Sequence, residues 1–329
     1  MSDSLFQRSW HNQPISTAKA FGDTLLKLAG RHKNIVVLTA NYKRFLNLAP
    51  FELAFPDRYF SFGNAEQNMV AAASGFAARG KIPFVCSFSM FVTGRAWEQI
   101  HSAIAYQNLN IKIVGAHNGL SSGENGENGA TYQALEDIAL MRVIPNMKVV
   151  CPADAIETKR ALEAIVNDFG PTYLRLNCDP VAHLYPETYQ FSFGQGNIYK
   201  PGTDVCIFSV GRMVHNVLEA SQLLERDSIS TMVVNLASIK PIDENLIVEC
   251  SKQARHVMTV EDHQIISGLG SAVMEVLSRK YPMKVVSIGV NGFGDSGKSD
   301  ELYKKHGLDA QGIYERVLSI INPSFQGPF

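Results

Sequence analysis

The sequence predicts an α/β protein with two domains, each built around a parallel sheet. Short apolar runs alternate with helix-length stretches along most of the chain, which is typical of parallel α/β folds. The alternation stops in a polar and aromatic stretch at residues 180–202 and then starts again. The length of 329 residues also suits two domains, at roughly 100–200 residues each.

The first domain is expected to span residues 15–185. Its predicted strands are apolar runs too short to form a helix. They lie at Ile35–Leu38, Phe84–Cys86, Ile111–Val114, Lys148–Val150 and Tyr173–Leu176. Helices are predicted at Ser16–Leu28, Gln67–Ala78, Ala96–Tyr106, Leu135–Arg142 and Ile156–Asn167.

The second, smaller domain is expected to span residues 200–325. Its predicted strands are Val205–Ser209, Ser230–Asn235, Val257–Val260 and Val285–Val290. The helices between and after them are predicted at Met213–Leu224, Asp243–Gln253, Gly270–Arg279 and Asp309–Ile321.

The composition excludes several classes of protein. Hydrophobic residues make up 46% of the chain and charged residues 19%, so a sizeable core can form. The formal net charge of −1 favours neither nucleic acid nor an anionic membrane as a partner. Residues 1–14 lack the apolar core of a signal peptide, and no apolar run reaches the roughly 20 residues of a membrane span. The five cysteines are widely spaced, which predicts reduced thiols in a cytoplasmic protein.

One segment carries most of the chemical information. Gly63 permits a tight turn, and Glu66 follows it at the start of a helix rich in Ala, Ser and Gly. The helix dipole favours a carboxylate at this position. Glu66 could therefore be only a first-turn helix acid, unless its surroundings give it another role.

The stretch Phe62-Gly63-Asn64-Ala65-Glu66-Gln67-Asn68-Met69-Val70, with the residues that follow it, resembles the pyrimidine-binding domain of transketolases. The resemblance implies that Glu66 is the catalytic carboxyl group that meets the aminopyrimidine ring of thiamine diphosphate. Such a group favours the imino tautomer of the ring, whose nitrogen then takes the proton of the thiazolium carbon. Glu66 should be buried, so that it can hold or share a proton.

The resemblance also implies the residues that bind the cofactor ring. Phe88 and Phe91 match aromatic residues that stack on the aminopyrimidine or line its pocket, although two phenylalanines after a strand could simply be core residues. Asn41 follows the first strand where the family has an aspartate near the cofactor, and it could equally be a turn residue. The stretch Thr93-Gly94-Arg95-Ala96-Trp97-Glu98-Gln99-Ile100 is most similar to short, split transketolase subunits.

The second domain resembles the transketolase C-terminal domain. The motifs Ile239-Lys240-Pro241-Ile242-Asp243, Val260-Glu261-Asp262-His263 and Gly292-Phe293-Gly294-Asp295-Ser296-Gly297 follow its pattern, so the resemblance runs from about residue 14 to 322. In the family this domain mainly builds the dimer. His263 is therefore expected to be structural or at an interface.

No residue of this chain is predicted to hold a metal ion. Thiamine enzymes hold Mg²⁺ and the diphosphate through a Gly-Asp-Gly motif and a later Asn, and the chain has no Gly-Asp-Gly. The resemblance thus implies that a separate N-terminal transketolase-like subunit holds the diphosphate and the magnesium. The expected assembly is an α2β2 heterotetramer with active sites between subunits.

Several positions that usually face the substrate depart from the family. A tandem Gly-Glu-Asn puts Asn125 or Asn128 where the family has an aspartate, and Tyr132 where it has a histidine. Tyrosine cannot carry the charge of histidine near neutral pH. His117 is retained on the side of the substrate channel, and it could also be a buried residue at a strand end.

Three further departures concern a sugar phosphate. The family arginine after Thr17 is Ala18, a serine is replaced by Phe45, and a second arginine is replaced by Cys178. Arginine suits phosphate because its donors form a fork. These losses predict a non-standard substrate, and a compound without a phosphate group is one such substrate. Arg175 is retained and is expected to brace the domain.

The predicted function is that of the C-terminal subunit of a split, thiamine-diphosphate-dependent transketolase. It would transfer a two-carbon ketol or acyl unit between small carbonyl compounds and would need its partner for activity. Two alternatives stay open at this point. One is the β subunit of a 2-oxoacid dehydrogenase or a deoxyxylulose-phosphate-synthase-like enzyme, and the other is a non-catalytic assembly or regulatory subunit.

Overall fold

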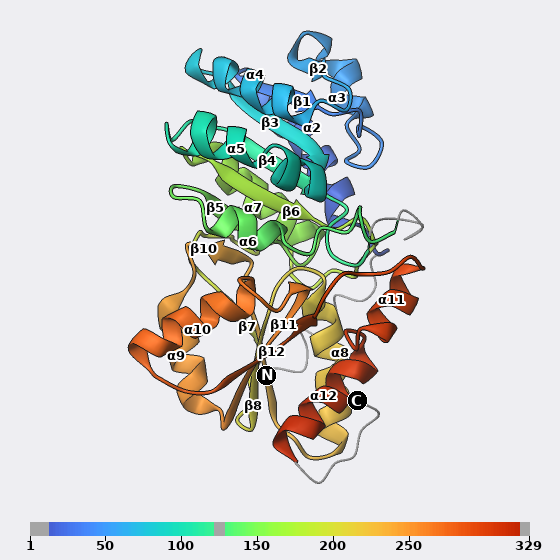
Figure 1. The fold of residues 1–329 in the computed structure, drawn as a ribbon, viewed down its shortest axis with the longest axis vertical. Helices are drawn as coiled ribbons and strands as arrows, with labels where there is room; N and C mark the ends of the chain where they lie inside the picture. Colours follow the sequence, from blue (N-terminus) through green and yellow to red (C-terminus); the bar gives the residue numbers. More distant parts are fainter. Residues whose placement is uncertain (1–12, 122–128, 323–329) are drawn as a thin grey trace.

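A computed structural model describes residues 13–121 and 129–322, and it places two α/β sheets one above the other along the long axis of the molecule (Figure 1). Strands β1 to β6 of the first sheet come from residues 35–176, and the second sheet lies within residues 197–290. The predicted class, two α/β domains with mostly parallel sheets, is confirmed.

The first sheet has seven strands in the order β10-β5-β6-β4-β3-β1-β2. All neighbours are parallel except β10, which pairs antiparallel with β5. The strands are β1 (Ile35–Thr39), β2 (Tyr59–Ser61), β3 (Ile82–Phe88), β4 (Lys112–Ala116), β5 (Lys148–Val150), β6 (Thr172–Leu176) and β10 (Ser238–Lys240).

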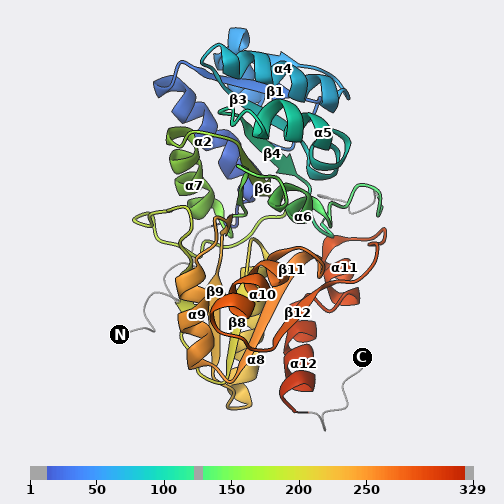
Figure 2. The ribbon, with the colours of Figure 1, turned by 60° about the vertical axis from the view of Figure 1, so that its left-hand side comes forward.

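Helices cover both faces of this sheet, and Figure 2 shows it between them. Alternate residues of β1 face opposite ways: Ile35 and Val37 pack with α2 (Thr17–Arg31) and α7 (Ala155–Asn167), whereas Val36 and Leu38 pack with the other layer. The other layer contains α4 (Glu66–Ala78), α5 (Trp97–Gln99), α6 (Asp137–Arg142) and the π-helical segments η2 (Phe91–Arg95) and η3 (Ile100–Ala105). Between β1 and β2 lie α3 (Ala49–Ala54) and the 3-10 turn η1 (Pro56–Arg58).

The second sheet has five strands in the order β12-β11-β8-β9-β7, with β7 antiparallel to β9. The strands are β7 (Asn197–Lys200), β8 (Val205–Ser209), β9 (Thr231–Asn235), β11 (His256–Gln264) and β12 (Val285–Val290). One face packs on α9 (Glu244–Gln253) and α10 (Leu269–Lys280). The other packs on α8 (Met213–Arg226), α11 (Ser299–Lys305) and α12 (Ala310–Ile321).

Side-chain caps fix several helix starts. Asp154, Asp243 and Asp309 each accept a hydrogen bond from the backbone N–H three residues later, at the starts of α7, α9 and α12. These bonds satisfy N–H groups that have no partner inside the helix.

The structure differs from the predicted secondary structure in several details. The helix expected at Ala96–Tyr106 is broken, with one α-turn between two π-helical segments. The stretch at residues 180–202 contains β7, and β10 joins the first sheet although it follows the second domain's β9. The sequence analysis missed β2, β7 and β10, because strands of three or four residues are too short to show an alternating pattern.

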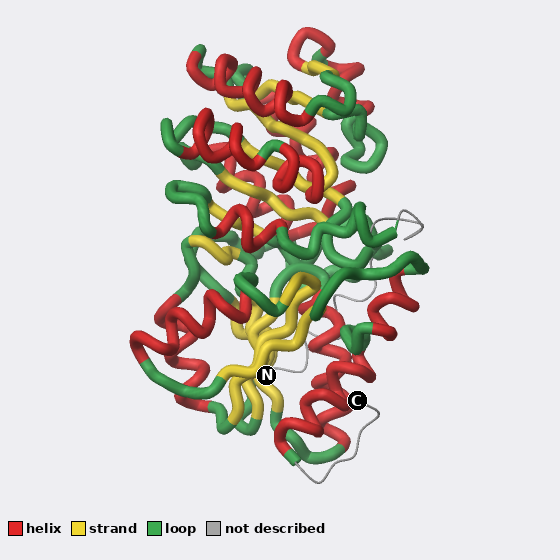
Figure 3. Tube along the Cα trace, viewed as in Figure 1, coloured by secondary structure: helices red, strands yellow, loops and turns green. Residues whose placement is uncertain are grey.

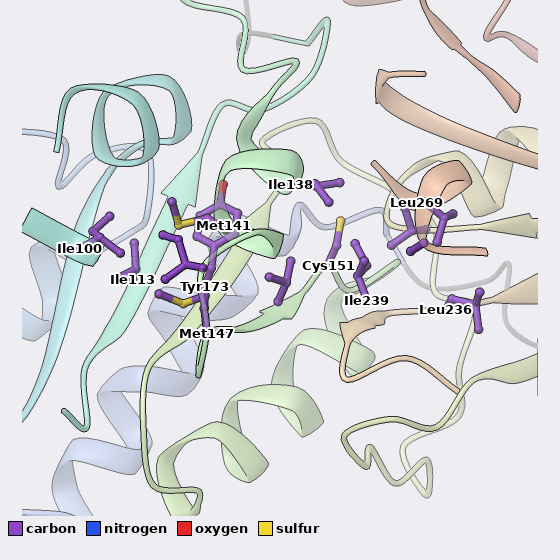
Figure 4. Close-up of a cluster of buried hydrophobic side chains, with 14 of the residues drawn as sticks. Ile100, Ile113, Ile138, Met141, Met147, Cys151, Tyr173, Leu236, Ile239 and Leu269 are labelled. Atoms are coloured by element: carbon purple, nitrogen blue, oxygen red, sulfur yellow. The ribbon is translucent and has the colours of Figure 1, made fainter. Parts of the chain in front are cut away.

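The two domains share a continuous hydrophobic core. It runs from the α4–α6 side of the first sheet to the α9–α10 side of the second. Figure 4 shows Tyr173 and Met141 at the first-domain end, Cys151 and Ile239 near the middle, and Leu236 and Leu269 toward the second domain. Because the apolar contacts cross the boundary, the two sheets stabilise each other.

A buried ion pair lies in the same boundary. The Arg175 Nε atom donates to Asp137 Oδ2 at 2.7 Å, and its Nη2 atom donates to the Asp262 carbonyl of the second domain at 2.9 Å. The Asp262 carboxylate accepts hydrogen bonds from the Leu120 backbone N–H and the Tyr303 hydroxyl. Arg175 therefore braces the two domains, as expected.

His263 is also part of this boundary. It is fully buried, its Nδ1 atom lies 2.7 Å from the Gln264 carbonyl, and its Nε2 atom accepts a hydrogen bond from the Ala139 backbone N–H. Burial lowers the pKa of His263 to about 4, so the ring stays neutral near pH 7. Its contacts are structural, as expected.

Glu157 of α7 forms a second link between the domains. Its buried carboxyl group accepts hydrogen bonds from Asn235 of the second sheet, the Tyr189 hydroxyl and the Ala153 backbone N–H. Burial, with a smaller contribution from Asp154, raises its pKa to about 7.

Glu157 should make the protein less stable as the pH rises. Between its ordinary value of 4.5 and about 7, the carboxyl group is ionised in the unfolded chain but protonated in the folded one. The contribution of Glu157 to the free energy of unfolding is therefore complete below pH 4.5 and is lost as the pH passes 7. The change amounts to about 3 kcal/mol.

We expect Glu157→Gln to remove this pH-dependent contribution to stability. Urea unfolding at several pH values should show a smaller loss of stability between pH 5 and 7.5 than in the wild type. Burial also raises the pKa of Glu261 to about 7, but that group contributes to both proteins and cancels in the difference. Glu163→Gln, a partly exposed residue of the same helix, should keep the wild-type slope, and equal slopes in all three proteins would contradict the assignment.

Candidate active site

The candidate site lies at the carboxyl ends of β1, β3, β4 and β6, which are neighbours in the first sheet. Because these strands are parallel, the loops that follow them meet at one edge. Figure 3 shows many of the loops gathered between the two sheets. Tyr42 and Phe45 follow β1, Phe88 ends β3, His117 follows β4 and Cys178 lies beyond β6.

Glu66 is the buried carboxylate of the site. It is the first residue of α4, and its side chain is fully buried. The Oε1 atom accepts a hydrogen bond from the Ser87 hydroxyl at 3.2 Å, and Oε2 accepts one from Arg95 Nη1 at 2.6 Å. A buried carboxylate needs such partners, because desolvation without them costs several kcal/mol.

Arg95 links this carboxylate to an aromatic ring. Its guanidinium carbon lies 4.5 Å from the centroid of the Phe91 ring, which allows a cation–π contact. The Arg95 side chain is 45% exposed, so it closes the outer side of Glu66 and can move without disturbing the core. Phe91 is only partly buried, and Tyr132 packs edge-on against it at 5.2 Å.

Phe88 lies deeper and is already covered. Tyr42 stacks on it with ring centroids 4.1 Å apart and an angle of 24° between the rings. His117 and Phe45 lie at 4.4 and 5.3 Å, and Phe88 itself is 4% exposed. A flat cofactor ring could therefore stack on Phe88 only if Tyr42 moved, whereas Phe91 is more accessible.

The surroundings of Tyr42 also change the pKa of its hydroxyl group. Burial and the negative charge of Glu66 raise the pKa of Tyr42, so its hydroxyl stays neutral and can donate a hydrogen bond. The loop that carries Tyr42 begins at Asn41, which has a left-handed backbone with φ of 69°. The Asn41 side chain is exposed.

The predicted substrate-facing residues are only partly brought together. His117 is buried in a left-handed backbone conformation, with φ of 55°, and its ring meets Phe45 edge-on at 4.5 Å. His117, Phe45 and Cys178 line one cavity, whose wall also includes Lys19 and Arg44, while Tyr132 lies on the Phe91 side. Asn125 and Asn128 lie outside the described residues.

The second domain holds the segment that carries Tyr132. The next residue, Gln133, donates from Nε2 to the carbonyl of Leu120 at 3.0 Å and to that of Asp295 at 2.8 Å. A side chain at Gly294 would collide with Gln133, since a β-carbon at that position would lie 1.7 Å from Oε1. The Gly-Phe-Gly-Asp motif thus reaches across the domain boundary and supports the site.

Sequence reasoning missed two residues that touch the predicted catalytic and ring-binding groups. The sequence shows Arg95 only as part of a family-like stretch, and it gives no signal for Tyr42. Neither contact can be read locally, because the sheet brings together residues that are distant in the chain. Among residues 13–121 and 129–322, no cluster of three or more His, Cys, Asp or Glu side chains could hold a metal ion.

Comparison with protein families accounts for both domains. Residues 13–179 match the pyrimidine-binding domain of transketolase, and residues 194–313 match the transketolase C-terminal domain. The chain belongs to the transketolase family. This agrees with the resemblance found in the sequence.

Individual relatives include separate transketolase sections and subunits. The chain is 44% identical over 304 residues to a transketolase C-terminal section of Methanocaldococcus jannaschii, covering 91% of this chain and 94% of that protein. It is 33% identical over 312 residues to one of the subunits of the apulose-4-phosphate transketolase of Phocaeicola vulgatus, covering 94% and 99%. A solved structure described as a split gene transketolase, inactive beta4 tetramer, superimposes with a TM-score of 0.84 at 40% identity, over 93% of this chain and 98% of that one.

The pair formed by Glu66 and Arg95 can be tested by unfolding. Arg95→Met should destabilise the transketolase chain by about 1–3 kcal/mol, because it leaves the Glu66 carboxylate buried with Ser87 as its remaining partner. Glu66→Gln combined with Arg95→Met should recover most of that loss, because no buried charge then remains. Urea unfolding of the single and double variants gives the coupling energy, and strictly additive effects would show that the pair does not interact.

Proposed function

We propose that this chain is the C-terminal subunit of a split, thiamine-diphosphate-dependent transketolase. It transfers a two-carbon ketol unit between carbonyl compounds together with a separate N-terminal subunit. The observation that carries the proposal is the buried Glu66 carboxylate beside the partly exposed Phe91 ring. Family membership along nearly the whole chain supports it.

The residues present fit one half of a site for an aminopyrimidine. Such a ring needs an acidic group near a ring nitrogen and an aromatic side chain against its face, and Glu66, Phe91 and Phe88 offer both. When bound, thiamine diphosphate supplies the carbanion that adds to a substrate carbonyl. The same residues do not fit Mg²⁺, because the described part of the chain contains no cluster of side chains that could bind a metal ion.

Each residue of this half-site has a proposed task. Glu66 presents a carboxyl oxygen with which a ring nitrogen of the cofactor would share a proton. Ser87 fixes the other oxygen, so the carboxyl group keeps one orientation. Arg95 occupies Oε2 in the structure and swings outward when that oxygen is needed, which its half-exposed side chain permits. On the substrate side, His117, Tyr132 and Cys178 face the incoming carbonyl compound.

The partner subunit is proposed to hold the diphosphate and Mg²⁺ in an α2β2 assembly. The chain has no Gly-Asp-Gly motif, which fits this division of labour. The split gene transketolase with the same fold is described as inactive in its beta4 form, which is expected for a subunit that provides half of a site. We place the enzyme in the cytoplasm, since none of its five cysteines forms a disulfide. No helix in the described ranges is long and apolar enough to span a membrane.

The acid role of Glu66 predicts a large loss of turnover. In the assembled enzyme, Glu66→Gln should lower kcat at least about 100-fold, because general acid–base catalysis contributes that much or more. The thermal unfolding profile of the chain should stay close to that of the wild type. Glu98→Gln removes an exposed carboxylate of the same region and should keep wild-type turnover. An active Glu66→Gln enzyme would refute the catalytic assignment.

Because Tyr42 stacks on Phe88, we predict that it competes with the cofactor ring and weakens cofactor binding. Tyr42→Leu removes the competing ring, and it should tighten binding of thiamine diphosphate to the assembled enzyme by up to about tenfold. Tyr42→Phe keeps the ring and should match the wild type. The dissociation constants follow from titration of the apoenzyme with cofactor. Weaker binding by the Leu variant would mean that Tyr42 belongs to the cofactor pocket itself.

A further inference from the structure

An aromatic wall extends outward from the catalytic half-site. Phe45 packs on Phe88 with ring centroids 5.3 Å apart, and it meets His117 edge-on at 4.5 Å. On the other side, the Tyr132 ring lies 6.2 Å from Phe88 and 5.2 Å from Phe91. The five rings therefore form one continuous surface, and its outer members are Phe45 and Tyr132.

Phe45 is exposed where this wall meets the neighbouring cavity. Its side chain is 40% exposed, whereas most phenylalanine side chains in proteins are buried. It lines a cavity of about 210 Å³ together with His117 and Cys178. An apolar cavity of about 150 Å³ is large enough to bind benzene, so a single aryl ring fits this space. Exposed aromatic surface in a cavity beside polar groups is typical of a ligand-binding site.

The residues of this wall do not suit a chain of hydroxyl groups. Phe45 stands where the family has a serine, and Cys178 stands where it has an arginine. Both changes remove side chains that form strong hydrogen bonds, and Tyr132 replaces a histidine with a larger, more apolar ring. Substrate hydroxyl groups held against these rings would lose their hydrogen bonds to water without replacement, which is unfavourable.

An aryl ring, in contrast, finds favourable contacts on both sides of the cavity. One face or edge of the ring can pack on Phe45, as aromatic pairs commonly do. Lys19 and Arg44 also line the cavity, and a cation is attracted to the face of an aromatic ring. The cationic side of the cavity is therefore compatible with an aryl group that lies on Phe45.

We propose that Phe45 and Tyr132 form a subsite for an aryl group carried by the acceptor substrate. The acceptor is then an aldehyde whose carbonyl carbon bears an aromatic ring, and Phe45 is the main specificity-determining residue. The inference rests on the proposed transketolase function for the reaction, whereas the affinity of the wall for an aryl ring is independent of it.

Ketol transfer to such an acceptor is balanced with hydroxypyruvate as the donor. The bond between the carboxylate and the carbonyl carbon of hydroxypyruvate breaks, and CO₂ leaves. A new bond joins that carbonyl carbon to the aldehyde carbon of the acceptor, whose oxygen takes a proton from water. The product is an aryl-substituted dihydroxyketone.

A binding test requires neither cofactor nor partner. The probe is para-fluorobenzyl alcohol, a neutral aryl compound, which is titrated with the chain and followed by fluorine NMR. Phe45→Ser should raise its dissociation constant about fivefold, because the variant removes a ring–ring contact. Phe45→Tyr keeps the ring and should stay within about twofold of the wild type.

Phe169→Ser is the matched control for this titration. Phe169 is 68% exposed and lies in the loop before β6, at the opposite end of that strand from the candidate site. The control should bind the probe as the wild type does. Equal weakening in Phe169→Ser would show unspecific binding to exposed rings and overturn the proposal, and an unchanged dissociation constant in Phe45→Ser would do the same.

A second measurement in the assembled enzyme tests the substrate class. With hydroxypyruvate as the donor, benzaldehyde is compared with glycolaldehyde and with a phosphorylated aldose as acceptors. Phe45→Ser should lower kcat/KM for benzaldehyde relative to glycolaldehyde about tenfold, since it removes both apolar area and a ring contact. Tyr132→His should change the preference in the same direction.

Two outcomes separate this inference from the proposed function. A wild-type enzyme that prefers the phosphorylated aldose to benzaldehyde, or a Phe45→Ser variant that lowers kcat/KM equally for all acceptors, would overturn the aryl substrate class. If the probe binds as expected but no acceptor is turned over, the proposed function fails and the aryl subsite remains.

Discussion

The shared carboxyl edge of four parallel strands is the constraint on which the site depends. Parallel strands end on the same side of a sheet, so the loops after β1, β3, β4 and β6 have to meet there. Glu66 joins them because α4 starts directly after the short strand β2 and its first residue points back at Ser87 on β3. The framework of the site is thus a property of the sheet, while its chemistry is set by a few loop residues.

The second domain shapes the site without providing a side chain next to Glu66. Asp262 fixes the loop after β4 through the Leu120 backbone N–H, and the Asp295 carbonyl fixes Gln133 beside Tyr132. The bonds through Arg175 and Glu157 hold the two sheets in the orientation that these contacts need. The C-terminal domain therefore supports the candidate site by holding these loops in position.

The sequence was sufficient for the parts of the fold with strong local patterns. Ile35–Thr39 and Val205–Ser209 are continuous apolar runs, and both are fully buried strands near the predicted places. The family-like motif also placed Glu66 at a helix start and predicted its burial, which the structure confirms. The contacts of Arg95 with Glu66 and of Tyr42 with Phe88 could not be predicted from the sequence, because each joins residues far apart in the chain through the geometry of the sheet. For the same reason, the sequence showed the loss of cations at residues 18 and 178 but not the cavity that gathers Lys19 and Arg44.

The crossing of β10 into the first sheet limits how this protein can be divided. Residues 238–240 pair with β5, and the Cys151 backbone N–H adjoins them through a hydrogen bond to the Ala237 carbonyl. A fragment that stops at the linker between the domains would leave β5 with a row of backbone groups open to pairing with other chains. A gene break at that linker would thus produce two polypeptides prone to aggregation until they found each other, so the two halves of this chain are expected to be inherited as one reading frame.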